Sequence, residues 1–173
     1  FTEDYMRRRD PDCIRISDYQ PTDKPRFQDV YGYPFDTLRK DTYDWLAKQE
    51  LILVPFMAGG YDYGYPAVMV CPRNAAFFGF ALSQLQAFVE GKNLQTFKPR
   101  AILYVAPPFR HTHFNGRQVC VHHRSEDLHE IFAYNLYPGP SAKKGIYSVL
   151  LDIGEQEGWV TAHASAARII TPY

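Results

Sequence analysis

Cysteine is scarce in this chain of 173 residues. The three cysteines, Cys13, Cys71 and Cys120, are far apart and include no CxxC pair. Widely spaced and odd in number, they do not form the pattern of a disulfide framework or of a zinc knuckle. A reducing, cytoplasmic compartment is therefore expected.

Excess charge and long apolar runs are also lacking. Lysine plus arginine and aspartate plus glutamate number 19 each, so the formal net charge is zero. This balance gives no electrostatic reason to expect nucleic acid or an anionic membrane as a partner. No apolar run reaches the 18 or so residues of a membrane-spanning helix, and no signal peptide is evident. With 46% hydrophobic and 16% aromatic residues, one globular domain with a sizeable core is predicted.

Hydrophobic periodicity predicts short strands mixed with helices. The expected strands are Cys13–Ile16, Leu51–Phe56, Pro66–Cys71, Ala101–Ala106, Gln118–His122, Glu130–Tyr137 and Trp159–His163. The expected helices run from a cap at Asp36 or Thr37 to Gln49, from Ala75 (capped by Asn74) to Val89 before Gly91, and from Ile146 to Ile153. A helix over 125–137 competes with a hairpin there. Irregular alternation indicates a mixed α/β (α+β) domain rather than a doubly wound parallel sheet.

The stretch from Lys143 to His163 carries the strongest chemical signal. Two adjacent lysines precede a helix, whose positive end disfavours nearby cations. A neutral lysine amine can act as a base or a metal ligand. The alternative is an ordinary solvated lysine pair in a surface loop.

Two further groups of residues suggest weaker sites. Arg7, Arg8 and Arg9 beside Asp10 form a candidate oxyanion site, because guanidinium groups bind carboxylate and phosphate in a bidentate manner. The alternative is a cluster of surface ion pairs. His111 and His113 could bind metal or phosphate, or be plain surface. A metal site from His111, His113, His122 and His123 requires those side chains to converge.

Several segments resemble the N-terminal part of ATP-type phosphoenolpyruvate carboxykinase, in the order of that family. They are FKPRAILYVAPPF (97–109), EIFAYNLYPGPSAKKGIYSVLL (130–151), and the strand ending in His163 before Ser165-Ala166. LILVPFMAGG with PAVMVC resembles an earlier strand, loop and strand, and RDPD (9–12) weakly resembles a substrate loop. The resemblance implies a carboxykinase-like mixed sheet flanked by helices, and favours strand over helix at 130–137.

Residue by residue, the resemblance implies a divided site. Lys144 and His163, 19 residues apart, would be ligands of Mn²⁺ or Mg²⁺. Lys143 would be the catalytic lysine that neutralises substrate or phosphate charge. Arg9 would clamp a substrate carboxylate, and Tyr137 would stand in for the family's substrate-binding tyrosine. The parent protein would be a lyase and kinase that couples nucleotide-dependent phosphoryl transfer, from ATP or GTP, to decarboxylation of an oxaloacetate-like acid.

Departures from the family pattern define the rival hypothesis. Pro138 stands where the family has tyrosine, Ser141-Ala142 replace Glu-Met, and Ala162-His163-Ala164 replaces Met-His-Cys. No GxxxxGK[ST] phosphate loop occurs in residues 1–173. We therefore expect a fragment of a divergent carboxykinase-like protein, inactive alone and completed by a C-terminal nucleotide-binding domain. The rival is a non-catalytic domain of this fold that binds a small anionic metabolite or serves as an assembly module.

Overall fold

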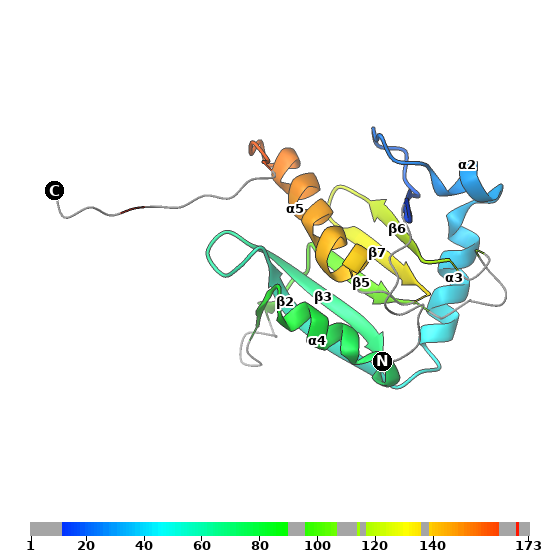
Figure 1. The fold of residues 1–173 in the computed structure, drawn as a ribbon, viewed down its shortest axis with the longest axis horizontal. Helices are drawn as coiled ribbons and strands as arrows, with labels where there is room; N and C mark the ends of the chain where they lie inside the picture. Colours follow the sequence, from blue (N-terminus) through cyan, green and yellow to red (C-terminus); the bar gives the residue numbers. More distant parts are fainter. Residues whose placement is uncertain are drawn as a thin grey trace.

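The architecture is a seven-stranded mixed sheet with helices on both faces (Figure 1). A computed structural model describes residues 12–89, 96–106, 114, 117–135, 139–162 and 169. The strands are β1 Ile14–Ile16, β2 Leu51–Ala58, β3 Tyr65–Pro72, β4 Ala87–Phe88, β5 Ala101–Val105, β6 Val119–Arg124 and β7 His129–Tyr134. Their order across the sheet is β1-β6-β7-β5-β3-β2-β4. The predicted mixed class is confirmed in this form.

Parallel and antiparallel pairings alternate in blocks. β1 runs parallel to β6, and β3, β5 and β7 run parallel to one another. The β6–β7 and β2–β3 pairs are antiparallel, and β4 adds antiparallel to one end of β2. The hairpin interpretation is confirmed over the described residues 118–135, and the competing helix is wrong there, because 129–134 is fully buried strand.

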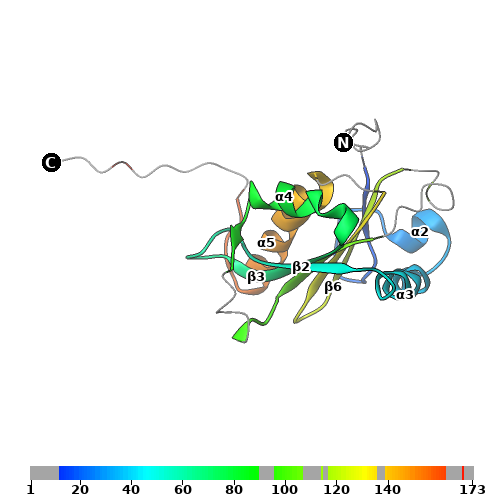
Figure 2. The ribbon, with the colours of Figure 1, turned by 90° about the horizontal axis from the view of Figure 1, so that it is seen from below.

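Alternating residues of the central strands face two separate cores. The helices are α2 Phe27–Tyr31, α3 Phe35–Leu46, α4 Phe77–Ser83 and α5 Lys144–Gln156. On one face α4 and α5 cover Leu103 and Ile131. On the other face α2 and α3 cover Val121 and Phe132. Figure 2 shows the two helical layers on opposite sides of the strands.

The helix α3 begins and ends earlier than predicted, and its last residue is Leu46 rather than Gln49. It begins at Phe35, after Pro34 in extended conformation, and no side-chain cap bonds its first turn. The predicted cap at Asp36 or Thr37 is therefore wrong, because Pro34 fixes the helix entry and takes the N-cap position two residues before Asp36. Buried residues recur four apart at Leu38, Thr42 and Leu46, as one face of a helix requires.

The predicted helix from Ala75 to Val89 is the largest correction. A 3₁₀ turn spans Arg73–Ala75, α4 ends at Ser83, and β4 follows at Ala87–Phe88. Phe88 pairs with Phe56 of β2. Strand pairing at the sheet edge thus overrides a helical pattern in which Leu85, 47% exposed, contributes little burial. The expected end at Gly91 lies outside the described residues.

Strand β2 is only half buried, contrary to the prediction. Leu51 is 38% exposed and Leu53 is 65% exposed, because α2 and α3 pack on the β5–β7 side of their face. Among the described residues, no helix covers this end of the sheet on that face.

The helix predicted over Ile146–Ile153 is confirmed and is longer, so Lys144 lies within it.

The predicted strand Trp159–His163 is wrong over its described residues, 159–162, which are irregular. The Trp159 amide donates to the Gly154 carbonyl at 2.8 Å, and this bond closes the end of α5. None of the helices seen in the described ranges has the length and apolarity needed to cross a bilayer. Cys13, Cys71 and Cys120 are all buried.

Candidate functional site

The two lysines singled out in the sequence lie at the start of α5. A π-helical turn, Gly139–Lys143, leads into the helix, and Lys143 occupies the N-cap position without a side-chain cap bond. Both Lys143 and Lys144 are exposed, whereas Ser141, Ala142 and Ile146 around them are buried. The buried residues anchor this turn against the core, so the two amines are held at the positive end of α5 and reach solvent.

The other residues of the predicted divided site cannot be placed beside these lysines. Arg9, Tyr137 and His163 lie outside the described residues. The first turn of α5 contains no acidic residue. The described geometry therefore provides an electropositive helix end with two exposed amines, which suits an anion.

The hypothesis of one metal site from four histidines is wrong. His122 and His123 are neighbours on β6 and point to opposite faces of the sheet. His122 Nδ1 lies 2.8 Å from His129 Nε2 beneath α5, whereas His123 Nδ1 lies 3.0 Å from Ser17 Oγ on the other face. His111 and His113 lie outside the described residues. Within the part of the chain that is described, no group of three or more His, Cys, Asp or Glu could hold a metal ion.

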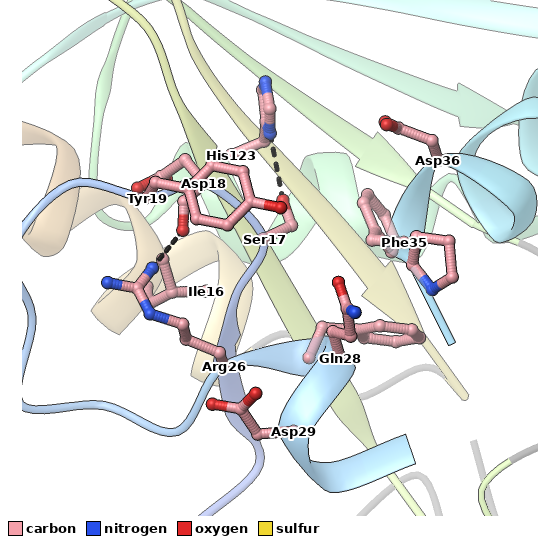
Figure 3. Close-up of a pocket in the computed structure, with 12 residues that line it drawn as sticks. Ile16, Ser17, Asp18, Tyr19, Arg26, Gln28, Asp29, Phe35, Asp36 and His123 are labelled. Atoms are coloured by element: carbon pink, nitrogen blue, oxygen red, sulfur yellow. Dashed lines mark hydrogen bonds between the residues drawn. The ribbon is translucent and has the colours of Figure 1, made fainter. Parts of the chain in front are cut away.

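A pocket of about 330 Å³ opens where the end of β1 meets the starts of α2 and α3. Figure 3 shows the bonded side chains of Ser17 and His123 on one side of the pocket, with Phe35 and Gln28 on the side of the helices. The Ser17 hydroxyl also lies 3.1 Å from the His122 carbonyl, to which it can only donate. With its proton used there, Ser17 accepts from His123, so the pair braces the pocket wall and does not form an activated nucleophile.

The loop that forms this pocket is fixed by a buried ion pair, Asp18–Arg124. The Asp18 carboxylate accepts from the Arg124 main-chain N–H at 2.7 Å and from its Nε and Nη2 at 3.0 and 2.8 Å. Burial alone would raise the pKa of Asp18, but the hydrogen bonds and charge of Arg124 outweigh burial and lower it. Arg26 bonds the Asp18 carbonyl (Figure 3), so it also belongs to this scaffold.

A second ion pair joins α3 to the sheet on the same face. Arg39 bonds Glu130 Oε2, and the Tyr43 hydroxyl donates to Glu130 Oε1 at 2.7 Å. The Glu130 side chain is 6% exposed and that of Arg39 is 25% exposed. The Arg39 guanidinium also lies over the rings of Phe132 and Tyr43. These contacts fasten α3, which forms one side of the pocket.

A third polar group, missed by the sequence reading, lies beneath α5. His129 Nδ1 is 2.9 Å from Asp152 Oδ2, and His129 Nε2 bonds His122. Burial, reinforced by the nearby His129, holds the pKa of His122 well below its ordinary value. The alternation of β6 and β7 could have placed the two histidines on one face, but Asp152 gives no such signal because it is distant in sequence.

The fold and these groups define a class: a mixed α/β domain with an electropositive helix end, a small polar pocket and a buried histidine cluster. The chain belongs to the family described as Domain of unknown function (DUF4914), whose model matches residues 1–173. No curated protein matches the chain.

Proposed function

We propose that the chain supplies the substrate and metal side of a carboxykinase-like active site in its parent protein. The observation that carries the proposal is the exposed Lys143–Lys144 pair at the N-terminal end of α5, in a first turn without acidic residues. The parent protein would use a nucleotide to phosphorylate and decarboxylate an oxaloacetate-like acid. This chain alone would bind the acid without turning it over.

The chemistry of such a site is chiefly the management of negative charge. Phosphoryl transfer is catalysed by positioning and by cations around the phosphate oxygens. The ammonium group of Lys143, at the N-terminal end of α5 and with no acidic residue in the first turn, would attract a carboxylate or phosphate. Lys144 with His163 would hold Mn²⁺ or Mg²⁺, which when bound polarises an oxygen of the substrate. Lys144 fits this role in being exposed and next to Lys143.

The order of strands and helices along the chain also supports the proposal, although less specifically than the lysine pair does. The resemblance to carboxykinases predicts a strand, a loop, the lysine pair and a helix, in that order. β7, the turn 139–143 and α5 follow this order, and β5 precedes them as a buried strand. The finer claim, that the sheet is that of a carboxykinase N-terminal domain, belongs to the proposal.

One observation favours the rival, a non-catalytic domain that binds an anionic metabolite. Ser141 and Ala142, which stand where carboxykinases have Glu-Met, are 0% and 1% exposed. Side chains buried in this way cannot contact a substrate. The lysines would then bind an anion without the catalytic loop of the family.

Titration of the chain with Mn²⁺ and with oxaloacetate, by calorimetry, tests both hypotheses. We expect Lys144→Ala and His163→Ala each to weaken Mn²⁺ binding by roughly tenfold or more, as loss of a metal contact does. Lys143→Ala should weaken oxaloacetate binding. Lys48→Ala, which removes an exposed lysine after α3, is the matched control. Unchanged Mn²⁺ affinity in both metal variants refutes the metal site. Metal-independent oxaloacetate binding that is lost in Lys143→Ala supports the rival.

A further inference from the structure

Four side chains form a continuous hydrogen-bonded line across the interface between α5 and the sheet. Cys120 Sγ lies 3.7 Å from His122 Nε2, His122 Nδ1 lies 2.8 Å from His129 Nε2, and His129 Nδ1 lies 2.9 Å from Asp152 Oδ2. His122 and His129 are 1% and 2% exposed, and the Asp152 side chain is 13% exposed. We call these four residues the histidine relay.

The position of each proton follows from the chemistry at the ends of the relay. An ionised Asp152 can only accept, so His129 Nδ1 carries a proton and donates it. A neutral His129 then accepts at Nε2 from His122 Nδ1–H. His122 accepts in turn at Nε2, where the Cys120 thiol can donate. With both imidazoles neutral, every nitrogen in the relay has a hydrogen-bond partner.

One extra proton changes the direction of the relay but not its connectivity. A protonated His129 donates from both nitrogens, to Asp152 and to His122 Nδ1. His122 then carries its proton on Nε2, against the sulfur of Cys120. The relay can therefore accept a proton without losing the bonds between His122, His129 and Asp152, at the cost of a buried positive charge.

The charged groups around the relay decide how well it tolerates a buried positive charge. Asp152 on α5 faces His129 on β7 and favours the charge. Arg124 on β6 opposes it, and Asp18, after β1, favours it at His122. The Asp18 carboxylate is already paired with Arg124. Towards β1, the titratable neighbour of Cys120 is the Cys13 thiol. The extra proton thus has one carboxylate to stabilise it, in a site closed to water.

We infer that the histidine relay is a pH-responsive latch that holds α5 on β6 and β7. In its neutral state the relay joins the helix to both strands. On acidification, the population of the state in which α5 has moved away from the sheet rises, since His122 is then hydrated and accepts a proton more readily. The latch acts on the helix whose first residues carry Lys143 and Lys144, so pH would alter the presentation of those amines. The inference does not depend on the proposed function.

The sign of the effect follows from linkage. His122 binds protons more weakly in the closed state than in the open state, where imidazole has its ordinary pKa of about 6.5. The contribution of His122 to closure is therefore complete above about pH 6.5 and falls as the pH drops below it. In that range the ratio of closed to open states decreases by up to about tenfold per pH unit for one proton.

Hydrogen exchange of the α5 amides in the full chain, corrected for intrinsic rates, tests the latch between pH 5 and pH 8. We expect α5 protection to fall below about pH 6.5 by up to about tenfold per pH unit, while α3 protection stays constant. His122→Asn, which keeps a donor towards His129 but does not titrate, should remove this dependence. Glu155→Gln, on the same helix, should keep it. Parallel changes in α3 and α5, or an unchanged profile in His122→Asn, overturn the inference.

A second measurement does not rely on any variant folding. Nitrogen-15 shifts of the imidazoles at pH 7.5 distinguish the two neutral tautomers. We expect His122 and His129 both to carry the proton on Nδ1. A proton on Nε2 of either ring would overturn the relay, because two N–H groups or two lone pairs would then face each other.

Discussion

The ion pair between Arg39 and Glu130 allows a sharp test of how α3 is held on the sheet. In Glu130→Gln the shape is kept and the charge is removed, so Arg39 loses its buried partner and Tyr43 competes with it for one amide oxygen. Removing one member of a buried ion pair costs about 3 to 5 kcal/mol. The Arg39 side chain is 25% exposed and has Asp36 at 3.8 Å. Because this exposure and the second carboxylate reduce the cost, we expect a loss of about 2 to 3 kcal/mol, at or just below the lower end of that range.

Urea unfolding measures this loss as a lower midpoint at an unchanged m value. In a domain of this size the loss corresponds to a fall in melting temperature of roughly 4 to 12 °C. The double variant Arg39→Gln/Glu130→Gln should lose clearly less than the sum of the two single variants, because the second change removes a charge that the first left unpaired.

The matched control is Arg73→Gln, which breaks the exposed pair with Glu50 and should change stability by no more than about 1 kcal/mol. A loss below about 0.5 kcal/mol in Glu130→Gln, or two single losses that simply add, would refute the reasoning.

Three further predictions concern buried polar groups. Tyr134→Phe should cost about 1 kcal/mol in urea unfolding, because Thr42 Oγ1, 2.7 Å from the Tyr134 hydroxyl, keeps its own bond to the Leu38 carbonyl; a loss above about 3 kcal/mol would contradict this. Burial raises the pKa of the Cys71 thiol to about 11, so Ellman's reagent should react with it at pH 8 quickly in denaturant and slowly in buffer, and equal rates would contradict the burial. The lowered pKa of Asp18 means that its contribution is complete above the ordinary value of about 3.9 and is lost as the pH falls through the folded value. Between pH 6 and pH 3 the urea midpoint of the wild type should therefore fall more than that of Asp18→Asn, and equal falls would count against the Asp18–Arg124 bond.

The parts of the fold that could be predicted are those in which local pattern and burial agree. The apolar run predicted as a strand forms β5, and its residues alternate between buried and half-buried along the strand. The apolar spacing in α5 likewise matches its buried face, Ile146, Val149 and Ile153. In both elements the strand or helix period alone places the apolar residues in a core, so the sequence is sufficient.

The errors arise where distant segments decide the outcome. The apolar residues around Phe88 fit a helix as well as a strand, and the free edge of β2 decides between them. Leu53 belongs to a strongly apolar run, yet its exposure depends on where α3 packs. The histidine relay joins His122 to Asp152, 30 positions further along the chain, and no local pattern marks it. Of the candidate site, only the lysine pair can be assessed, since its predicted partners lie outside the described residues.

The bond between Asp18 and Arg124 also has a consequence for how the sheet is aligned. The sequence of β6 is VCVHHR, which places small apolar residues on both faces of the strand and ends in two successive histidines and an arginine. A shift by one residue would exchange the two histidines and still leave an apolar residue on each face. The Asp18 carboxylate, however, binds both the main-chain N–H and the guanidinium of Arg124. It thus fixes the register of β6: a strand shifted by one residue would present Ser125 or His123 to Asp18, and neither carries the guanidinium that donates to this carboxylate from Nε and Nη2.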